Sequence, residues 1–189
     1  PPNYNVTMAE RLIPAAYLSE QISTAGKAPS GTGNMKFALN GPLTIGTLDG
    51  ANVEIRDHVG TENFFLFGLT AQEVMVRRTH HSYSRAAIEA SPRLQRVLGQ
   101  IAEGRFAPQD PSRYHGLVGM LYDHDYFLVT CDFDSYFDTQ RRADMAYQTP
   151  ANWAAMALVN TASMGWFSSD RTIRGYAHDI WGAKSVLSA

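Results

Sequence analysis

A glycine-rich turn followed closely by a lysine is the feature that most constrains this chain. Residues 30–37 read Ser-Gly-Thr-Gly-Asn-Met-Lys-Phe, and a helix-compatible apolar stretch follows. A helix that opens at Thr32 or Gly33 would present free backbone N–H groups to an anion, and the glycines would let a phosphate approach closely. Lys36 would then lie about one turn inside the helix, near the anion. An amine beside a phosphate indicates a lysine that holds pyridoxal phosphate as a Schiff base.

The same glycines allow three other interpretations. A plain structural turn stays open, because Gly-x-Gly before a helix is common. A Walker A loop is excluded, since Gly26 and Gly31 have its spacing but Thr32 stands where a lysine is required. A dinucleotide-binding fingerprint is also excluded, because Lys36 holds the position of its third glycine. A long charged side chain there would block close packing of helix on strand.

Several longer motifs resemble one known family. The run from Gly26 to Ile55, which contains Ser-Gly-Thr-Gly-Asn-Met-Lys-Phe and Thr-Leu-Asp-Gly-Ala-Asn, closely resembles the signature of the glycogen, starch and maltodextrin phosphorylases. Segments 18–26, 63–68 and 167–181 resemble the same family in the same order, and the similarity is weakest over 77–110. Members of this family are several times longer, so the chain resembles only their C-terminal part.

The resemblance implies a fold and the division of this chain into two segments. Phosphorylases are similar to glycosyltransferases of the GT-B type, in which two Rossmann-like α/β domains enclose the active site. We therefore expect residues 1–75 to be the second-half α/β segment of the C-terminal Rossmann-like domain, carrying the pyridoxal-phosphate lysine. We expect residues 76–189 to be the mainly helical remainder of that domain, with one strand and the closing helices.

The resemblance also implies a reaction. Inorganic phosphate attacks the terminal α-1,4-glucosidic bond of glycogen or maltodextrin and releases glucose 1-phosphate with retained configuration. The phosphate group of the pyridoxal phosphate cofactor takes part, by proton exchange with the substrate phosphate or by electrostatic support of it. The implied partners are the α-1,4-glucan, inorganic phosphate or glucose 1-phosphate, the rest of the phosphorylase chain, and a second copy in a homodimer.

Individual cofactor residues follow from the resemblance. Lys36 matches the lysine that holds pyridoxal phosphate, and Thr32 and Gly33 match the groups that hydrogen-bond its phosphate. Tyr4 matches a tyrosine near that phosphate.

Substrate residues follow in the same way. Ser30 and Gly31 match residues whose backbone meets the glucosyl unit. Arg11 stands where many members carry a catalytic lysine for the substrate phosphate, and the guanidinium supplies the same charge with different geometry. Without the family, Arg11 would be interpreted as a solvated charge on a helix.

The chain departs from the family pattern at five positions. Ala28 replaces a glutamate that accepts hydrogen bonds from sugar hydroxyls, a loss of ~1.5–3 kcal/mol. Asn5 replaces an arginine that binds phosphate, and the others are Tyr17, Pro29 and Pro42. These changes leave open a catalytically impaired paralogue or remnant that binds cofactor or carbohydrate. A Rossmann-like nucleotide-binding module unrelated to phosphorolysis is the other alternative.

Turn and capping signals predict α/β alternation with a parallel sheet, followed by a mainly helical part. The predicted strands are 20–24, 43–48, 64–67 and 126–131. The predicted helices begin at or near residues 7, 33, 51, 70, 92, 111, 150 and 169, and we expect the apolar face of the last helix to be packed.

Composition excludes several classes of protein. The net charge of −2 over 189 residues gives no sign of nucleic-acid or membrane binding. The single cysteine, Cys131, cannot form an internal disulfide, which favours a reducing cytoplasm. His80 and His81 are adjacent and would point in different directions on a helix, so we expect no metal site.

Overall fold

A computed structural model describes residues 2–27, 31–79 and 83–184. The candidate substrate residue Ser30, the departures Ala28 and Pro29, and the two adjacent histidines lie outside the described residues. The strands are β1 (Leu18–Gln21), β2 (Leu43–Gly46) and β3 (Phe65–Leu66). The helices are α1 (Val6–Ala15), α2 (Gly33–Leu39), α3 (Ala51–Val59), α4 (Ala71–Arg78), α5 (Tyr83–Ala90), α6 (Pro92–Ala102), α7 (His115–Asp123), α8 (Val129–Tyr147), α9 (Pro150–Ser163) and α10 (Ser169–Gly175). Shorter helical turns are η1 (Thr61–Asn63), η2 (Met164–Phe167) and η3 (Tyr176–Ile180).

The three strands form one parallel sheet in the order β1-β2-β3. Leu18 pairs with Leu43, and Ile45 pairs with Phe65. Every residue of β2 is buried. The run Leu-Thr-Ile-Gly alternates in polarity, yet Thr44 is as buried as Leu43 and Ile45, because helices cover both faces of a parallel sheet. The predicted α/β alternation with a parallel sheet is confirmed.

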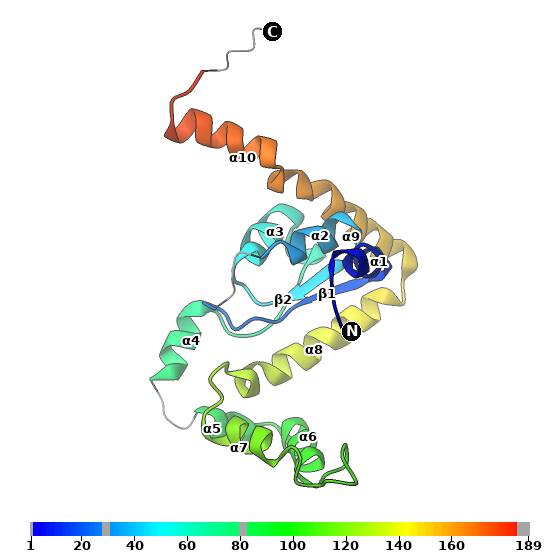
Figure 1. Ribbon diagram of the computed structural model, residues 1–189, viewed down its shortest axis with the longest axis vertical. Coiled ribbons are helices and arrows are strands. Elements are labelled where there is room, and N and C mark those ends of the chain that lie inside the picture. The colour runs from blue at the N-terminus through cyan, green and yellow to red at the C-terminus, as the bar shows by residue number, and fades with distance from the viewer. Residues whose placement is uncertain (1, 28–30, 80–82, 185–189) are drawn as a thin grey trace.

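Helices lie on both sides of this sheet. Figure 1 shows α2 and α3 on one side and the long helix α8 on the other. On the side of α2 and α3, Ala38, Ile55, Phe64 and Met164 form a buried cluster. A second cluster joins the sheet to α8 and α9, and its buried members are Leu43, Ile45, Phe65, Phe67, Ala143, Trp153 and Met156. Both clusters therefore connect residues that lie more than 80 positions apart in the sequence.

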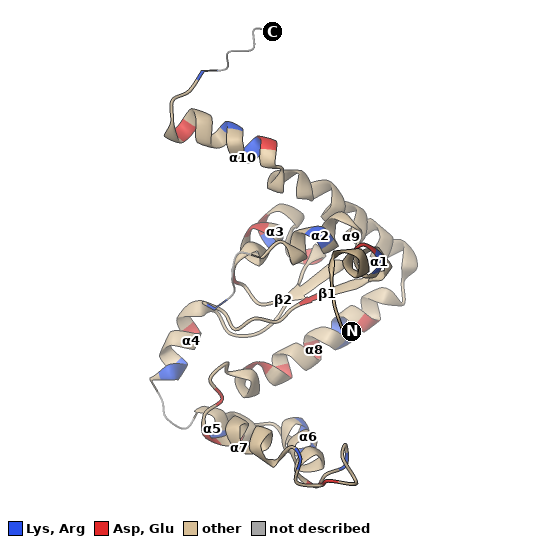
Figure 2. Ribbon diagram, in the orientation of Figure 1, with Lys and Arg blue, Asp and Glu red and all other residues tan. Residues whose placement is uncertain are grey.

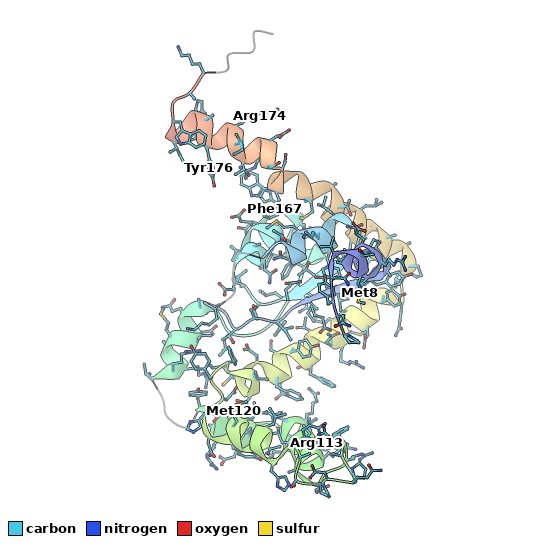
Figure 3. All side chains as sticks on the ribbon, in the orientation of Figure 1. Met8, Arg113, Met120, Phe167, Arg174 and Tyr176 are labelled. Atoms are coloured by element: carbon cyan, nitrogen blue, oxygen red, sulfur yellow. The ribbon has the colours of Figure 1, made fainter. Side chains whose placement is uncertain are left out.

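A separate group of helices packs against α8. Ile88, Leu94 and Leu98 from α5 and α6 form its buried centre, with Phe133 of α8 packed against it. Figure 3 shows Arg113 and Met120 in this group, at the end of the molecule opposite to Arg174. Figure 2 shows acidic and basic residues interspersed along the helices.

The strand predicted at 126–131 is wrong. Val129 begins α8, and Leu128 before it has a left-handed backbone with φ of 54°. The buried carboxylate of Asp125 accepts hydrogen bonds from the amides of Val129 and Thr130 at 3.0 and 2.8 Å. This side chain caps the helix, so the apolar run Tyr-Phe-Leu-Val turns into a helix start instead of continuing as a strand.

Other boundaries also differ from the prediction. The first strand is 18–21, not 20–24, because the chain leaves the sheet at residue 22. The first helix is capped by Asn5, whose side chain accepts from the amide of Met8 at 3.0 Å, so it begins before Thr7. The helix expected from Pro111 begins at His115, because turns occupy the preceding residues.

The last helix does not pack its apolar face among the described residues. Ile173, Tyr176, Ile180 and Trp181 are exposed, and α10 projects away from the sheet in Figure 1. The capping signals at two other helices are confirmed. Thr70 and Glu73 form a complete capping box at α4, and Ser91 caps α6.

Candidate active site

The candidate site lies where the parallel strands end. β1 leads through residues 22–32 to α2, and β2 leads through Gly50 to α3. Gly50 has φ of 54° and ψ of −141°, a conformation that glycine adopts without strain. The starts of both helices therefore face the carboxyl edge of the sheet, where open α/β folds bind ligands.

One cavity gathers the four residues that were assigned to the cofactor. Its volume is about 790 Å³, and Tyr4, Thr32, Gly33 and Lys36 all line it. The remaining lining residues come from α1, α2 and the residues beside them: Asn5, Val6, Ala9, Glu10, Ile13, Pro14, Phe37 and Asn40. α1 and α2 are in contact, so residues some 30 positions apart enclose one space.

Lys36 and Thr32 share one face of α2. The amide of Lys36 donates to the carbonyl of Thr32 at 3.1 Å, so the lysine lies one turn into the helix, as the sequence predicts. The Thr32 side chain makes no capping hydrogen bond. A Cβ placed on Gly33 would have no atom within 4 Å, so the space beside this glycine is open.

The opposite face of α2 is anchored in the protein interior. Asn34 is buried and its side-chain Nδ2 donates to Oδ1 of Asn52 at 3.1 Å. Nδ2 of Asn52 in turn donates to the carbonyl of Thr47 at 3.0 Å. Sequence reasoning missed both asparagines. Both belong to the quoted family run, but their pairing depends on a contact between two helices.

Two assigned residues that the structure describes lie outside this cavity. Arg11 is exposed on α1 and does not line it, because the face of α1 toward α2 carries Val6, Ala9, Glu10 and Ile13. Gly31 lines a smaller cavity of about 90 Å³. This cavity also includes Gly33 and lies at the carboxyl ends of β1 and β2.

A third cavity contains a perturbed carboxyl group. Its volume is about 420 Å³, and its walls are mainly apolar, with Ile22, Phe67, Phe127 and Tyr136 among them. Asp132 also lines it, and burial raises the pKa of this carboxyl from 3.8 to about 6. The hydrogen bond that Asp132 accepts from the amide of Leu69 at 2.8 Å opposes this shift in pKa.

The residues of the large cavity suit pyridoxal phosphate. Lys36 supplies an exposed primary amine that can react with the aldehyde of the cofactor. For the phosphate, Thr32 supplies a hydroxyl, and Gly33 supplies a backbone that no side chain shields. The volume of the cavity is within the range of small-molecule sites. Across the described ranges, no group of three or more His, Cys, Asp or Glu side chains could hold a metal ion.

Comparison with known proteins gives the class of this chain. Residues 1–183 match the family described as carbohydrate phosphorylase, and the chain belongs to that family. It is 52% identical over 186 residues to the glycogen phosphorylase of Synechocystis sp., and 49% identical over 185 residues to that of Haemophilus influenzae. It is 47% identical over 182 residues to the muscle form of glycogen phosphorylase from Homo sapiens.

These alignments cover 96–98% of this chain but only 22% of each of the three relatives. The chain therefore corresponds to about a fifth of a phosphorylase. Within the portion that the structure describes, no helix is both long and apolar enough to span a membrane.

Proposed function

We propose that this chain is part of a glucan phosphorylase that uses inorganic phosphate to cleave terminal α-1,4-glucosidic bonds of glycogen or maltodextrin, releasing glucose 1-phosphate. The observation that carries the proposal is the single cavity that Tyr4, Thr32, Gly33 and Lys36 line together. The relatives that support it are named glycogen phosphorylase.

Four residues of the cavity have a role in this proposal. The Lys36 Nζ would hold pyridoxal phosphate covalently, and the Thr32 hydroxyl and the Gly33 amide would donate hydrogen bonds to its phosphate. Tyr4, from the segment before α1, would be a further partner of that phosphate. When bound, pyridoxal phosphate supplies a phosphate group that exchanges a proton with the substrate phosphate or supports its charge.

The substrate is proposed to lie at the adjacent carboxyl edge of the sheet. Gly31, which lines the smaller cavity, would present its main-chain groups to the glucosyl unit. Arg11 supplies positive charge for the substrate phosphate when α1 presents it to the site. Its guanidinium is exposed on α1, so entry into the site would cost part of its hydration, and the negative charge of the substrate phosphate would have to offset that cost.

The wider context is part of the same proposal. Residues 1–75 and 76–189 would be two portions of the C-terminal Rossmann-like domain of a GT-B enzyme, which acts as a homodimer in the cytoplasm. Burial raises the pKa of the Cys131 thiol, which keeps it protonated and unreactive and fits a structural cysteine in a reducing compartment.

A specific observation favours a second candidate, a catalytically impaired relative that retains the cofactor. Asn5 lines the large cavity where many family members carry an arginine, and Arg11 lies outside it. Glu10 lines the cavity as well, so its described walls hold one acidic group and one basic group, Lys36. With one negative and one positive charge, the cavity walls attract a second phosphate less strongly than walls with a net positive charge would.

The test uses the full-length polypeptide that carries these residues. Release of glucose 1-phosphate from glycogen and inorganic phosphate is measured together with the absorbance of bound pyridoxal phosphate. Lys36→Ala should abolish both signals, whereas Lys184→Ala, which removes a lysine outside the cavity, should preserve both. Full activity of Lys36→Ala would contradict the proposal. Bound cofactor without glucose 1-phosphate release from the unmodified protein would favour the impaired relative.

A further inference from the structure

We propose that Asn52 is a positioning residue for Lys36, acting through Asn34 to fix the rotation of α2. The inference rests on the proposed function, because it assigns a purpose to the orientation of Lys36. Asn52 lies one helix away from Lys36 and does not line the large cavity, although Asn52 and Asn34 both line the smaller cavity beside Gly31. Its influence on the amine must therefore pass through another side chain.

The two faces of α2 have opposite environments. Successive residues of a helix are rotated by about 100°, so Asn34 projects roughly opposite to Thr32 and Lys36. Asn34 is 7% exposed, whereas Lys36 is exposed to the cavity. A constraint on the Asn34 side chain therefore sets the direction in which Lys36 leaves the helix.

The constraint is a chain of two buried hydrogen bonds. Asn34 donates to Asn52, and Asn52, which is 3% exposed, donates to the carbonyl of Thr47, the first residue after β2. Thr47 is itself fixed to the loop that follows β1, because its hydroxyl donates to the carbonyl of Ser23 at 2.6 Å. The first turn of α2 is thereby connected to the sheet at the carboxyl ends of two strands.

The surrounding backbone leaves room for this arrangement. A Cβ on Gly46 would lie 2.7 Å from Nδ2 of Asn52 and 3.0 Å from the carbonyl oxygen of Gln21. Any side chain at this position would push Asn52 out of its place. Glycine at the last position of β2 is therefore a requirement of the Asn52 contact.

The other end of α2 has an independent anchor, which provides a matched control. The hydroxyl of Thr161 on α9 donates to the carbonyl of Ala38 at 3.0 Å. Thr161→Val removes this hydrogen bond with little change of shape, at the end of the helix away from Thr32 and Gly33. Asn52→Ala and Asn34→Ala remove the anchor at the beginning of the helix.

The experiment uses the full-length polypeptide and two readouts. The first is the rate at which bound pyridoxal phosphate is released, followed by its absorbance. Asn52→Ala should accelerate release by about tenfold, Asn34→Ala by a similar factor, and the double variant by no more than either single change, because both substitutions break the same chain. Thr161→Val should lower the thermal unfolding midpoint without accelerating release.

The second readout does not require the cofactor. Amide hydrogen exchange of residues 31–36 in the cofactor-free protein should become faster in Asn52→Ala and Asn34→Ala but not in Thr161→Val. Equal effects of all three substitutions, or no effect of the asparagine substitutions, would overturn the inference. If the unmodified protein takes up no pyridoxal phosphate, the proposed function fails, and the exchange measurement alone decides whether Asn52 orients α2.

Discussion

Thr32 and Lys36 lie one helical turn apart on the same face of α2, and the amide of Lys36 donates to the carbonyl of Thr32 at 3.1 Å. Both residues line the large cavity. A hydroxyl and an amine that emerge from one side of a helix, four residues apart, can bind two ends of one small ligand. The short spacing of Gly-Thr-Gly-Asn-Met-Lys is therefore what places the two groups together.

This relationship predicts the effect of removing the hydroxyl. Thr32→Val keeps the shape of the side chain and would eliminate the proposed hydrogen bond to a charged phosphate, a kind of bond that contributes about 1.5–3 kcal/mol. In the full-length polypeptide, pyridoxal phosphate should dissociate at least about tenfold faster. Thr61→Val is the control, because Thr61 is exposed in η1 and does not line the cavity. Equal dissociation rates for the two variants would contradict the assignment of Thr32.

The cap at the start of α8 predicts a large effect on stability. Asp125 is 2% exposed and accepts hydrogen bonds from two amides and from the Thr130 hydroxyl. Asp125→Ala should lower the free energy of unfolding of the 189-residue chain by about 2 kcal/mol in urea denaturation. Asp123→Ala should cost less than about 1 kcal/mol, since Asp123 is exposed and pairs with Arg85 at the surface. Similar losses for both would show that Asp125 is not a cap.

Asp132 predicts a dependence of stability on pH. Burial raises the pKa of this carboxyl from 3.8 to about 6, and the nearby carboxylates of Asp125 and Glu73 act in the same direction. The folded chain therefore binds the proton more tightly than the unfolded chain. The contribution of Asp132 to stability is complete below about pH 4 and is lost as the pH rises through 6.

Asp132→Asn cannot ionise and keeps an acceptor for the amide of Leu69. Its free energy of unfolding should rise relative to that of the unmodified chain between pH 4 and 7, by at most about 3 kcal/mol. Asp134→Asn is the control, because it removes a carboxyl that is about half exposed on the same helix. A difference between the two variants therefore reflects the burial of Asp132 and not merely the loss of one negative charge. A constant difference between Asp132→Asn and the unmodified chain across this range would contradict the prediction.

Local signals in the sequence predicted most of the sheet and several helix starts. The apolar run at 64–67 lies between clear turn residues, and the structure places a strand there. Thr70 and Glu73 satisfy each other within four residues, so their capping box is visible in the sequence. The run at 126–131 was misinterpreted because its conformation depends on the side chain of Asp125 and on the left-handed backbone of Leu128. The pattern of apolar residues in the sequence reveals neither the Asp125 cap nor the left-handed backbone of Leu128.

The candidate site was also predicted only in part: its local features were found, and its contacts between elements were missed. The spacing of Thr32 and Lys36 is local, and the sequence predicted their shared turn. Tyr4 was assigned only through the family resemblance, because it reaches the cavity through the packing of α1 on α2. The pairing of Asn34 with Asn52 joins residues 18 positions apart and was not predicted. Contacts between elements are set by packing, which a single sequence does not display.

This chain is only a small part of a phosphorylase, which predicts that it has no activity in isolation. The chain corresponds to 22% of the length of its relatives, so the cleft between two domains that we propose for the full-length enzyme would not form around a glucan. We expect the purified 189 residues to release no glucose 1-phosphate from glycogen and inorganic phosphate. Measurable release by this chain alone would contradict the view that it is one portion of the enzyme.

The most direct test of the central claim is to identify the residue that holds the cofactor. The full-length polypeptide is loaded with pyridoxal phosphate, reduced with borohydride, digested and analysed by mass spectrometry of the peptides. The reduced cofactor should be found on Lys36, and Lys36→Ala should carry no label. Label on another lysine, such as Lys27, with none on Lys36 would contradict it.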